Sequence, residues 1–164
     1  MDCRYNNYQK PYTSLYQKAL LHLQCFLFKR NNMKTTTRWI KDLSFEGEYD
    51  NHVVKIDTTR EGSTGMNPKR LLLCSLAACS GIDVVGILNK MKVIYTKLEI
   101  TAEAEQTDVD PKVFKEIFLT YVTDAKQEDA DKVRRAVELS KEKYCGISAM
   151  LSKHCPIHFT IQHV

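Results

Sequence analysis

The chain has no surplus of charge over most of its length. Its 24 lysine and arginine residues outnumber its 20 aspartate and glutamate residues by four, and this whole excess falls within residues 1–32. Residues 33–164 therefore carry equal numbers of basic and acidic side chains. A protein that binds nucleic acid needs a basic face to neutralise phosphates. The balanced composition argues against DNA or RNA as a partner.

The N-terminal part of the chain also lacks a long apolar run. Its longest one, residues 19–28, is interrupted by His22 and Gln24 and is far shorter than the roughly 18 residues needed to span a bilayer. Lys29-Arg30-Asn31-Asn32 follows it, where a secretory signal would have a small-residue cleavage site. We therefore expect a cytoplasmic protein with no membrane partner.

Residues 1–32 show no periodicity typical of a helix or a strand. We interpret them as an N-terminal extension outside the domain, and we place a single domain at residues 33–164. The alternative is that residues 19–28 form a short amphipathic helix on the surface of that domain.

Beyond the extension, the patterns predict an α+β fold in the order β-β-β-α-β-β-α-β. The long helix begins at Asn67-Pro68, an N-cap followed by proline at the first helical position. It is apolar on nearly all sides, so we expect it to be buried centrally. A single chain has too few other elements to cover such a helix, and we therefore expect an obligate homodimer. The expected strands are 35–40, 43–49, 52–57, 97–105, 113–123 and 158–164, and the expected helices are 67–90, 128–144 and 147–152.

Six cysteines do not make this chain a disulfide scaffold, because 164 residues can bury a core without crosslinks. Cys3 and Cys25 lie in the extension. Cys74 lies about 140° around the long helix from Cys79, which disfavours a bond between them. We interpret Cys74 and Cys155 as buried core residues.

Cys79 and Cys145 occupy the two most distinctive contexts. Small residues surround Cys79 in Leu76-Ala77-Ala78-Cys79-Ser80-Gly81, so another backbone can come close to it. Cys145 opens a helix and is flanked by Lys141 and Lys143, an environment that favours a thiolate. On these grounds alone Cys145 is the better nucleophile. If the fold brings the two together, they form a dithiol that can cycle through a disulfide.

Other patterns indicate no cofactor and no metal. His154 and His158 should point away from Cys155 on a strand, so one ion could not bind all three. No strand leads into a Gly-x-Gly-x-x-Gly loop. Asp83, one helical turn after Cys79, would hinder thiolate formation, and could instead belong to a polar network or face a cation.

Two longer segments carry a family resemblance. Residues 65–85, from Gly65-Met66-Asn67-Pro68 through Ala77-Ala78-Cys79-Ser80-Gly81, resemble the central helix of the OsmC family, on the YhfA-type branch. Residues 138–151, around Tyr144-Cys145, resemble its second cysteine segment. The likeness implies an intertwined homodimer that reduces organic hydroperoxides, with Cys79 as the peroxidatic and Cys145 as the resolving cysteine. It also suggests a dithiol reductant such as a lipoylated protein.

The chain departs from the organic hydroperoxide resistance (Ohr) branch at charged positions. Lys69 and Arg70 stand where relatives carry a glutamate, and the arginine that activates the peroxidatic thiolate has no evident counterpart. Arg38, Lys41, Lys69 and Arg70 are the candidates for that cation. Two other functions stay open: a module that binds an acyl-type ligand, and a general thiol–disulfide reductant.

Overall fold

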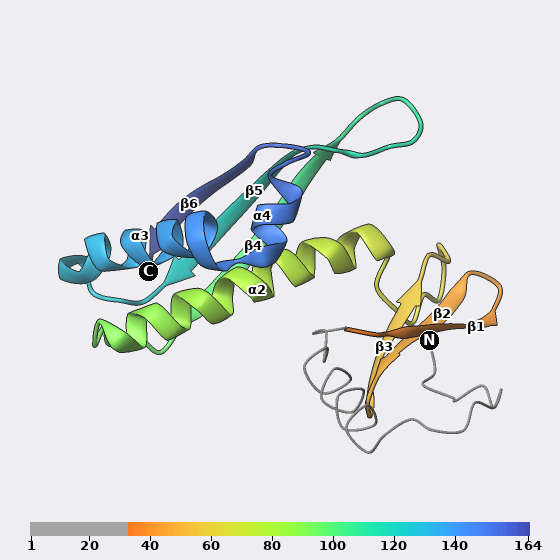
Figure 1. Cartoon of the computed structure of the whole chain (residues 1–164), viewed down its shortest axis with the longest axis horizontal. Coiled ribbons are helices and arrows are strands. Elements are labelled where there is room, and N and C mark those ends of the chain that lie inside the picture. Colours follow the sequence, from red (N-terminus) through yellow and green to blue (C-terminus); the bar gives the residue numbers. More distant parts are fainter. Residues whose placement is uncertain (1–32) are drawn as a thin grey trace, which may run out of the picture.

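The computed structural model describes residues 33–164 as two small sheets connected by one long helix (Figure 1). β1 (Thr36–Lys41), β2 (Ser44–Tyr49) and β3 (His52–Asp57) form an antiparallel sheet in that order. β4 (Leu98–Gln106), β5 (Phe114–Thr123) and β6 (Ile157–His163) form the second sheet, in which β4 and β5 are antiparallel and β6 is parallel to β5. The predicted α+β order is confirmed.

The helices lie between these strands in the chain. α2 (Pro68–Lys90) connects the two sheets, and α3 (Ala130–Leu139) follows the 3₁₀ turn η1 (Gln127–Asp129). A π-helical turn, η2 (Ser140–Tyr144), leads into α4 (Gly146–Leu151). The helix expected over 128–144 is therefore three segments with different hydrogen bonding. The extension and the possible helix at 19–28 lie outside the described residues.

α2 begins as its sequence predicts. The Asn67 side chain accepts a hydrogen bond of 2.9 Å from the backbone N–H of Lys69, and Pro68 takes the first helical position. By length and composition this helix could also cross a membrane, a test that core helices of soluble proteins pass too. Its buried stripe contains Ser80, which forms side-chain hydrogen bonds inside the protein.

The core lies between the β4–β5–β6 sheet and the helices that cover one of its faces. α2 contributes a stripe at four-residue spacing, and β5 and α3 contribute their inner faces. The fully buried residues of this core include Leu76, Val84, Leu88, Ile117, Tyr121, Val133 and Val137.

Only one side of α2 is buried within a single chain, which differs from the expected burial on all sides. Leu76 and Val84 are 0% exposed, whereas Ile82 is 73% exposed. The reason is that the β1–β2–β3 sheet, which could have covered the outer side, lies apart from the core (Figure 1). In those three strands Asp57 is the only buried residue.

The loop that leads from β3 to α2 is tied back onto β3. Two backbone hydrogen bonds make this link, Met66 N–H to the Lys55 carbonyl and Asp57 N–H to the Met66 carbonyl. A Cβ on Gly65 would lie 2.7 Å from the Lys55 backbone, so only glycine fits this close approach. N–H and O–H groups of Thr59 and Thr64 donate to Asp57 and lower the pKa of its carboxyl.

Candidate active site: a dithiol beside a buried chain of hydroxyls

The fold brings Cys79 and Cys145 together from positions 66 residues apart. Cys79 lies in the middle of α2 and Cys145 at the N-cap of α4, and the Cys145 thiol donates to the Cys79 sulfur across 2.9 Å. Both are free thiols. α2 comes close to its neighbours because its residues are small here: a Cβ on Gly81 would lie 2.9 Å from Cδ1 of Ile100 on β4. The juxtaposition that the sequence left conditional is present.

The π-helical turn η2 places Cys145. Its wider hydrogen-bond ring links the backbone N–H of Cys145 to the carbonyl of Ser140, five residues earlier, at 2.8 Å. The Cys145 sulfur also accepts from the backbone N–H of Ser148 at 3.3 Å. The extra residue in this turn thus holds Cys145 inward, against α2.

The surroundings of Cys145 correct the expectation that it is the more reactive thiol. Cys145 is only 2% exposed, and burial together with the neighbouring Cys79 raises its pKa to about 11. The lysines beside it face other partners: the Lys141 ammonium lies 5.5 Å from the Phe159 ring and that of Lys143 lies 5.6 Å from the Tyr144 ring. Cys145 therefore keeps its proton, and half-buried Cys79 presents the accepting sulfur.

A chain of buried hydroxyl groups runs beside the dithiol. The hydroxyl of Ser80 lies 2.6 Å from that of Tyr121 on β5 and 2.9 Å from that of Ser140. Ser140 in turn donates to the carboxylate of Asp83 at 3.1 Å. Tyr121, Ser80 and Ser140 are all 2% exposed or less. A strand, the long helix and the π-helical turn thus contribute to one polar network.

The hydrogen bonds in this network all donate in one direction, from Tyr121 toward Asp83. Burial, with a smaller contribution from the negative charge of Asp83, raises the pKa of the Tyr121 hydroxyl, which stays protonated and can donate. The Ser140 proton goes to Asp83, because a carboxylate only accepts. Each hydroxyl has one proton, so Tyr121 donates to Ser80, Ser80 to Ser140 and Ser140 to Asp83.

Asp83 is thus the end point of the hydroxyl chain and a neighbour of the dithiol. One of its carboxylate oxygens and the sulfurs of Cys79 and Cys145 all lie within 4.8 Å of one another. Of the three roles weighed from the sequence, membership of a polar network is the one observed. The sequence analysis missed Ser80, Ser140 and Tyr121. The signal for Ser80 was a polar side chain three residues before Asp83, in the middle of a helix that is mostly apolar there.

Of the remaining cysteines, one is buried as predicted and one is not. Cys155 is 4% exposed and fills the core as expected, with its pKa raised by burial. Cys74 is exposed, so the prediction that it is buried was wrong for the single chain. It lies on the outer side of α2, which no other element within residues 33–164 covers. Cys3 and Cys25 lie outside the described residues.

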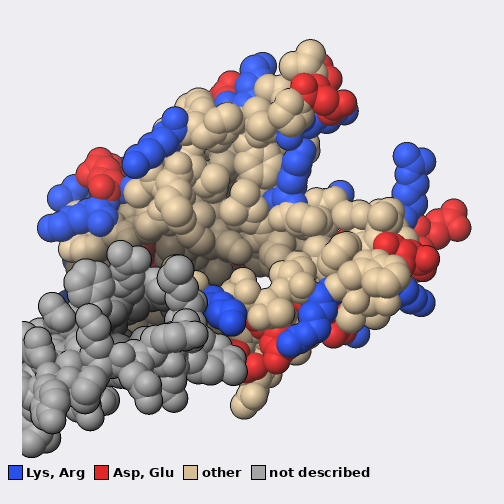
Figure 2. All heavy atoms as spheres, turned by 45° about the vertical axis from the view of Figure 1, so that its right-hand side comes forward, with Lys and Arg blue, Asp and Glu red and all other residues tan. Residues whose placement is uncertain are grey.

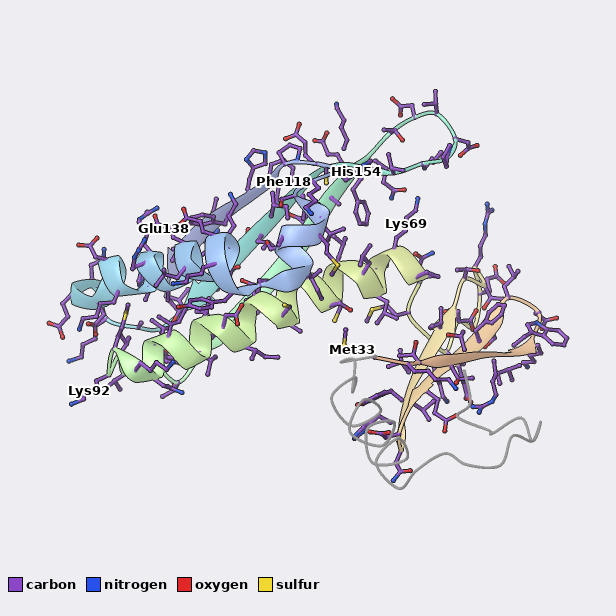
Figure 3. All side chains as sticks on the ribbon, in the orientation of Figure 1. Met33, Lys69, Lys92, Phe118, Glu138 and His154 are labelled. Atoms are coloured by element: carbon purple, nitrogen blue, oxygen red, sulfur yellow. The ribbon has the colours of Figure 1, made fainter. Side chains whose placement is uncertain are left out.

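None of the four candidate cations contacts the dithiol among residues 33–164. Arg38 pairs with Glu48 on the neighbouring strand, far from α2. The Lys69 ammonium extends from the start of α2 to the Gln106 side chain and the Lys112 carbonyl, at 2.8 and 2.6 Å (Figure 3). Arg70 lies about 13 Å along the helix axis from Cys79. Lys41 lies at the end of β1, in the β1–β2–β3 sheet, which lies apart from the core.

The residues weighed as a metal site separate as alternation predicts. His158 faces outward, where it contacts the Glu116 carboxylate at 3.2 Å and stacks on Phe118, while Cys155 points into the core. Cys79, Asp83 and Cys145 are a different cluster, in which the Cys145 thiol donates to Cys79 and Asp83 accepts from Ser140.

A comparison with protein families agrees with this geometry. The family model described as OsmC-like protein matches residues 60–163, which is more than half of the chain and contains both cysteines of the dithiol. The chain belongs to the OsmC family. This OsmC-family protein is 32% identical to Protein YhfA of Escherichia coli K12 over 122 residues, which cover 74% of this chain and 90% of YhfA. The resemblance read from the two cysteine segments is confirmed.

Solved structures of OsmC-like proteins share the fold. An OsmC-like protein from Mycoplasma pneumoniae superposes with a TM-score of 0.70 at 16% identity, covering 81% of this chain and 99% of the other. An organic hydroperoxide resistance protein OsmC from Legionella pneumophila superposes with a TM-score of 0.62 at 17% identity, with 81% and 99% covered. At these identities the likeness concerns the fold alone.

Proposed function

We propose that this protein is a thiol peroxidase that reduces organic hydroperoxides through Cys79 and Cys145. The observation that carries the proposal is the 2.9 Å approach of two free thiols, only one of which is deeply buried. A disulfide needs the sulfurs about 0.9 Å closer, a shift that side-chain rotation can supply. Membership of the OsmC family, in which the Legionella protein is named an organic hydroperoxide resistance protein, supports organic hydroperoxides as the substrate class.

The chemistry divides into three steps. The Cys79 thiolate attacks the outer peroxide oxygen, the O–O bond breaks, and the product leaves as an alcohol after taking a proton, while Cys79 becomes a sulfenic acid. Cys145 then attacks the Cys79 sulfur, forming the S–S bond and releasing water. A dithiol reductant, for which a lipoylated protein is the candidate, returns two electrons and two protons to restore both thiols.

An apolar hollow beside Cys79 suits the organic part of such a peroxide. It has a volume of about 560 Å³ and lies between the outer side of α2 and β4. Ala78, Ile82 and Val85 from the turns around Cys79 line it together with Ile100. A hydrocarbon chain bound in this hollow would be removed from contact with water, which is favourable for apolar groups.

We further propose a homodimer in which a second copy covers this side of α2. The outer side of α2 and the β1–β2–β3 sheet both expose large apolar side chains, more than a monomer in water usually shows. In Figure 2, which shows one face of the molecule, uncharged atoms make up most of the visible described surface, with charged groups scattered between them. Cys79 contacts no cation within residues 33–164 of one chain, so in this proposal the activating charge comes from the second copy, with Arg38 and Lys41 as candidates. The exposed apolar residues are Trp39, Ile40, Leu43, Phe45, Val53, Val54, Leu72, Ile82 and Val85.

The test is mass spectrometry after one equivalent of an alkyl hydroperoxide. The wild-type protein should lose two hydrogens as one Cys79–Cys145 disulfide forms. Cys145→Ser should stop with an oxidised Cys79, and Cys79→Ser should not react. Cys74→Ser, which removes an exposed thiol on the same helix, is the matched control and should still form the disulfide.

The same assay separates the alternatives. A general thiol–disulfide reductant would reduce a small disulfide as fast as it reduces a bulky peroxide. A module that binds an acyl-type ligand in the hollow would leave the peroxide unconsumed, and the peroxidase proposal would then be wrong.

A further inference from the structure

The carboxylate of Asp83 is the feature that a simple dithiol does not require. A negative charge beside two thiols opposes thiolate formation, yet this carboxylate ends a series of three hydroxyls, the last of which, Ser140, donates to it at 3.1 Å. No hydrogen bond of Asp83 with a lysine or arginine occurs within residues 33–164. The buried hydroxyl chain therefore holds in place a carboxylate whose oxygens can still accept another hydrogen bond.

The proton that needs an acceptor belongs to Cys145. When Cys145 attacks oxidised Cys79 it must lose its proton, and burial raises its pKa to about 11, so few Cys145 thiols ionise unaided near neutral pH. Asp83 lies within 4.8 Å of both sulfurs. A carboxylate at that distance, on a neighbouring turn of the same helix as Cys79, can reach the proton as the sulfurs approach.

We propose that Asp83 accepts the proton of Cys145 during disulfide formation, and that Ser140, Ser80 and Tyr121 position Asp83 for this transfer. The inference rests on the proposed function only in assigning Cys145 as the resolving thiol. In balance, the S–S bond forms, the Cys79 S–O bond breaks, and the Cys145 proton passes through Asp83 to the leaving hydroxide, which departs as water.

Several other titratable groups face this carboxylate. The thiols of Cys79 and Cys145 lie on one side, and the Tyr121 hydroxyl is connected through the two serines. On the other side Asp83 lines an open hollow of about 420 Å³ together with Lys90 and Tyr144. The Asp83 carboxylate is therefore also open to solvent on this side. A pH profile must therefore be compared between variants rather than read from the wild type alone.

The experiment uses an aromatic disulfide reagent, 5,5′-dithiobis(2-nitrobenzoic acid), in place of the peroxide. In a background with Cys3, Cys25 and Cys74 replaced by serine, the first thionitrobenzoate released reports attack by Cys79. The second reports attack of Cys145 on the mixed disulfide, a first-order step independent of reagent concentration. If the protein reacts with this reagent but not with peroxides, the peroxidase proposal is wrong, while the role of Asp83 can still be measured.

Asp83→Asn should slow the second release about tenfold or more near neutral pH, since general-base assistance contributes at least that factor. Its rate should rise about tenfold per pH unit, because hydroxide must now remove the Cys145 proton. The wild-type rate should depend less on pH. Asp83→Glu should recover part of the rate, and Ser140→Ala should slow the second release with little effect on the first.

Asp131→Asn, the same change at an exposed site on α3, is the control and should leave both releases unchanged. Melting temperatures of all variants separate unfolding from a chemical effect, and Ser140→Ala and Asp83→Glu carry the test if Asp83→Asn does not fold. A second release that is unchanged or faster in Asp83→Asn would overturn the proposal and leave Asp83 as a charge that only hinders Cys145. Absence of a second release from the wild type would overturn it as well.

Discussion

The two thiols at the candidate site differ in how each is held. Cys145 is buried, donates to Cys79 and accepts from the Ser148 backbone, whereas Cys79 is half-buried and only accepts. This asymmetry agrees with the roles that the family resemblance implies and opposes the assignment made from flanking charges. Flanking lysines raise reactivity only if their ammonium groups face the sulfur, and those of Lys141 and Lys143 face aromatic rings instead.

The burial of Cys145 leads to a prediction about alkylation. With its pKa raised from 9.0 to about 11, its thiolate fraction near pH 8 should be about 100-fold lower than in the unfolded chain. Iodoacetamide should therefore label Cys145 at least about 100-fold more slowly in the folded protein than in urea, as followed by peptide mass spectrometry. Labelling of Cys145 before Cys79 would contradict the conclusion that Cys145 is the thiol that keeps its proton.

At the level of the elements, the segment between α2 and β4 is held by hydrogen bonds to one carboxylate, that of Asp124 at the end of β5. Asp124, directly after β5, accepts from the backbone N–H groups of Thr96 and Lys97 at 2.9 and 2.8 Å, and from the Thr96 hydroxyl. These bonds lower its pKa from 3.8 to about 2. They keep α2 in place against the sheet that carries Tyr121.

Asp124 should therefore contribute to stability in a pH-dependent way. Its pKa is lower in the folded than in the unfolded state, so its contribution is present above about pH 4 and lost as the pH falls toward 2. Asp124→Asn should lower the melting temperature at neutral pH, and the difference from wild type should shrink below about pH 4. Asp108→Asn, on the exposed loop after β4, serves as the control. A difference that grows on acidification would disprove this linkage.

At the scale of the whole molecule, a single chain leaves its longest helix half-covered. The exposed side of α2 and the apolar β1–β2–β3 sheet have no partner within residues 33–164, and Ile82 is 73% exposed. Burial of such surfaces stabilises a protein by about 25 cal/mol per Å² of apolar area, which favours association. The proposed homodimer follows from this arrangement.

Light scattering should therefore find about twice the 18.9 kDa mass of the chain at micromolar concentration. Ile82→Lys should shift the protein toward monomer and lower its melting temperature, because a charge would be buried between the copies. Ile94→Lys is the matched control, since Ile94 is 77% exposed but follows the end of α2. A stable, folded monomer of the wild type would contradict the proposal.

The second whole-molecule prediction concerns residues 1–32. They carry the entire net charge and precede the first strand, so a chain that begins at Met33 should keep the oligomeric state and melting temperature of the full chain. The two chains would be compared by light scattering and circular dichroism. A clear drop in melting temperature would favour the alternative in which residues 19–28 pack on the domain.

Local sequence patterns were enough to predict the order of the elements, the start of α2 at Asn67-Pro68, and the two cysteines worth testing. These follow from local signals: capping chemistry, alternation along strands, and small residues around Cys79. The family resemblance could likewise be read from contiguous segments, because its motifs lie in short continuous stretches of the chain.

Which thiol keeps its proton, and which groups surround it, depends on contacts between distant parts of the chain and could not be predicted from local patterns. Burial depends on what other elements cover, so Cys145 proved buried and Cys74 exposed, against their local contexts. The chain from Tyr121 through Ser80 and Ser140 to Asp83 joins β5, α2 and η2, and its members are up to 60 residues apart. No periodicity marks residues that meet only after folding.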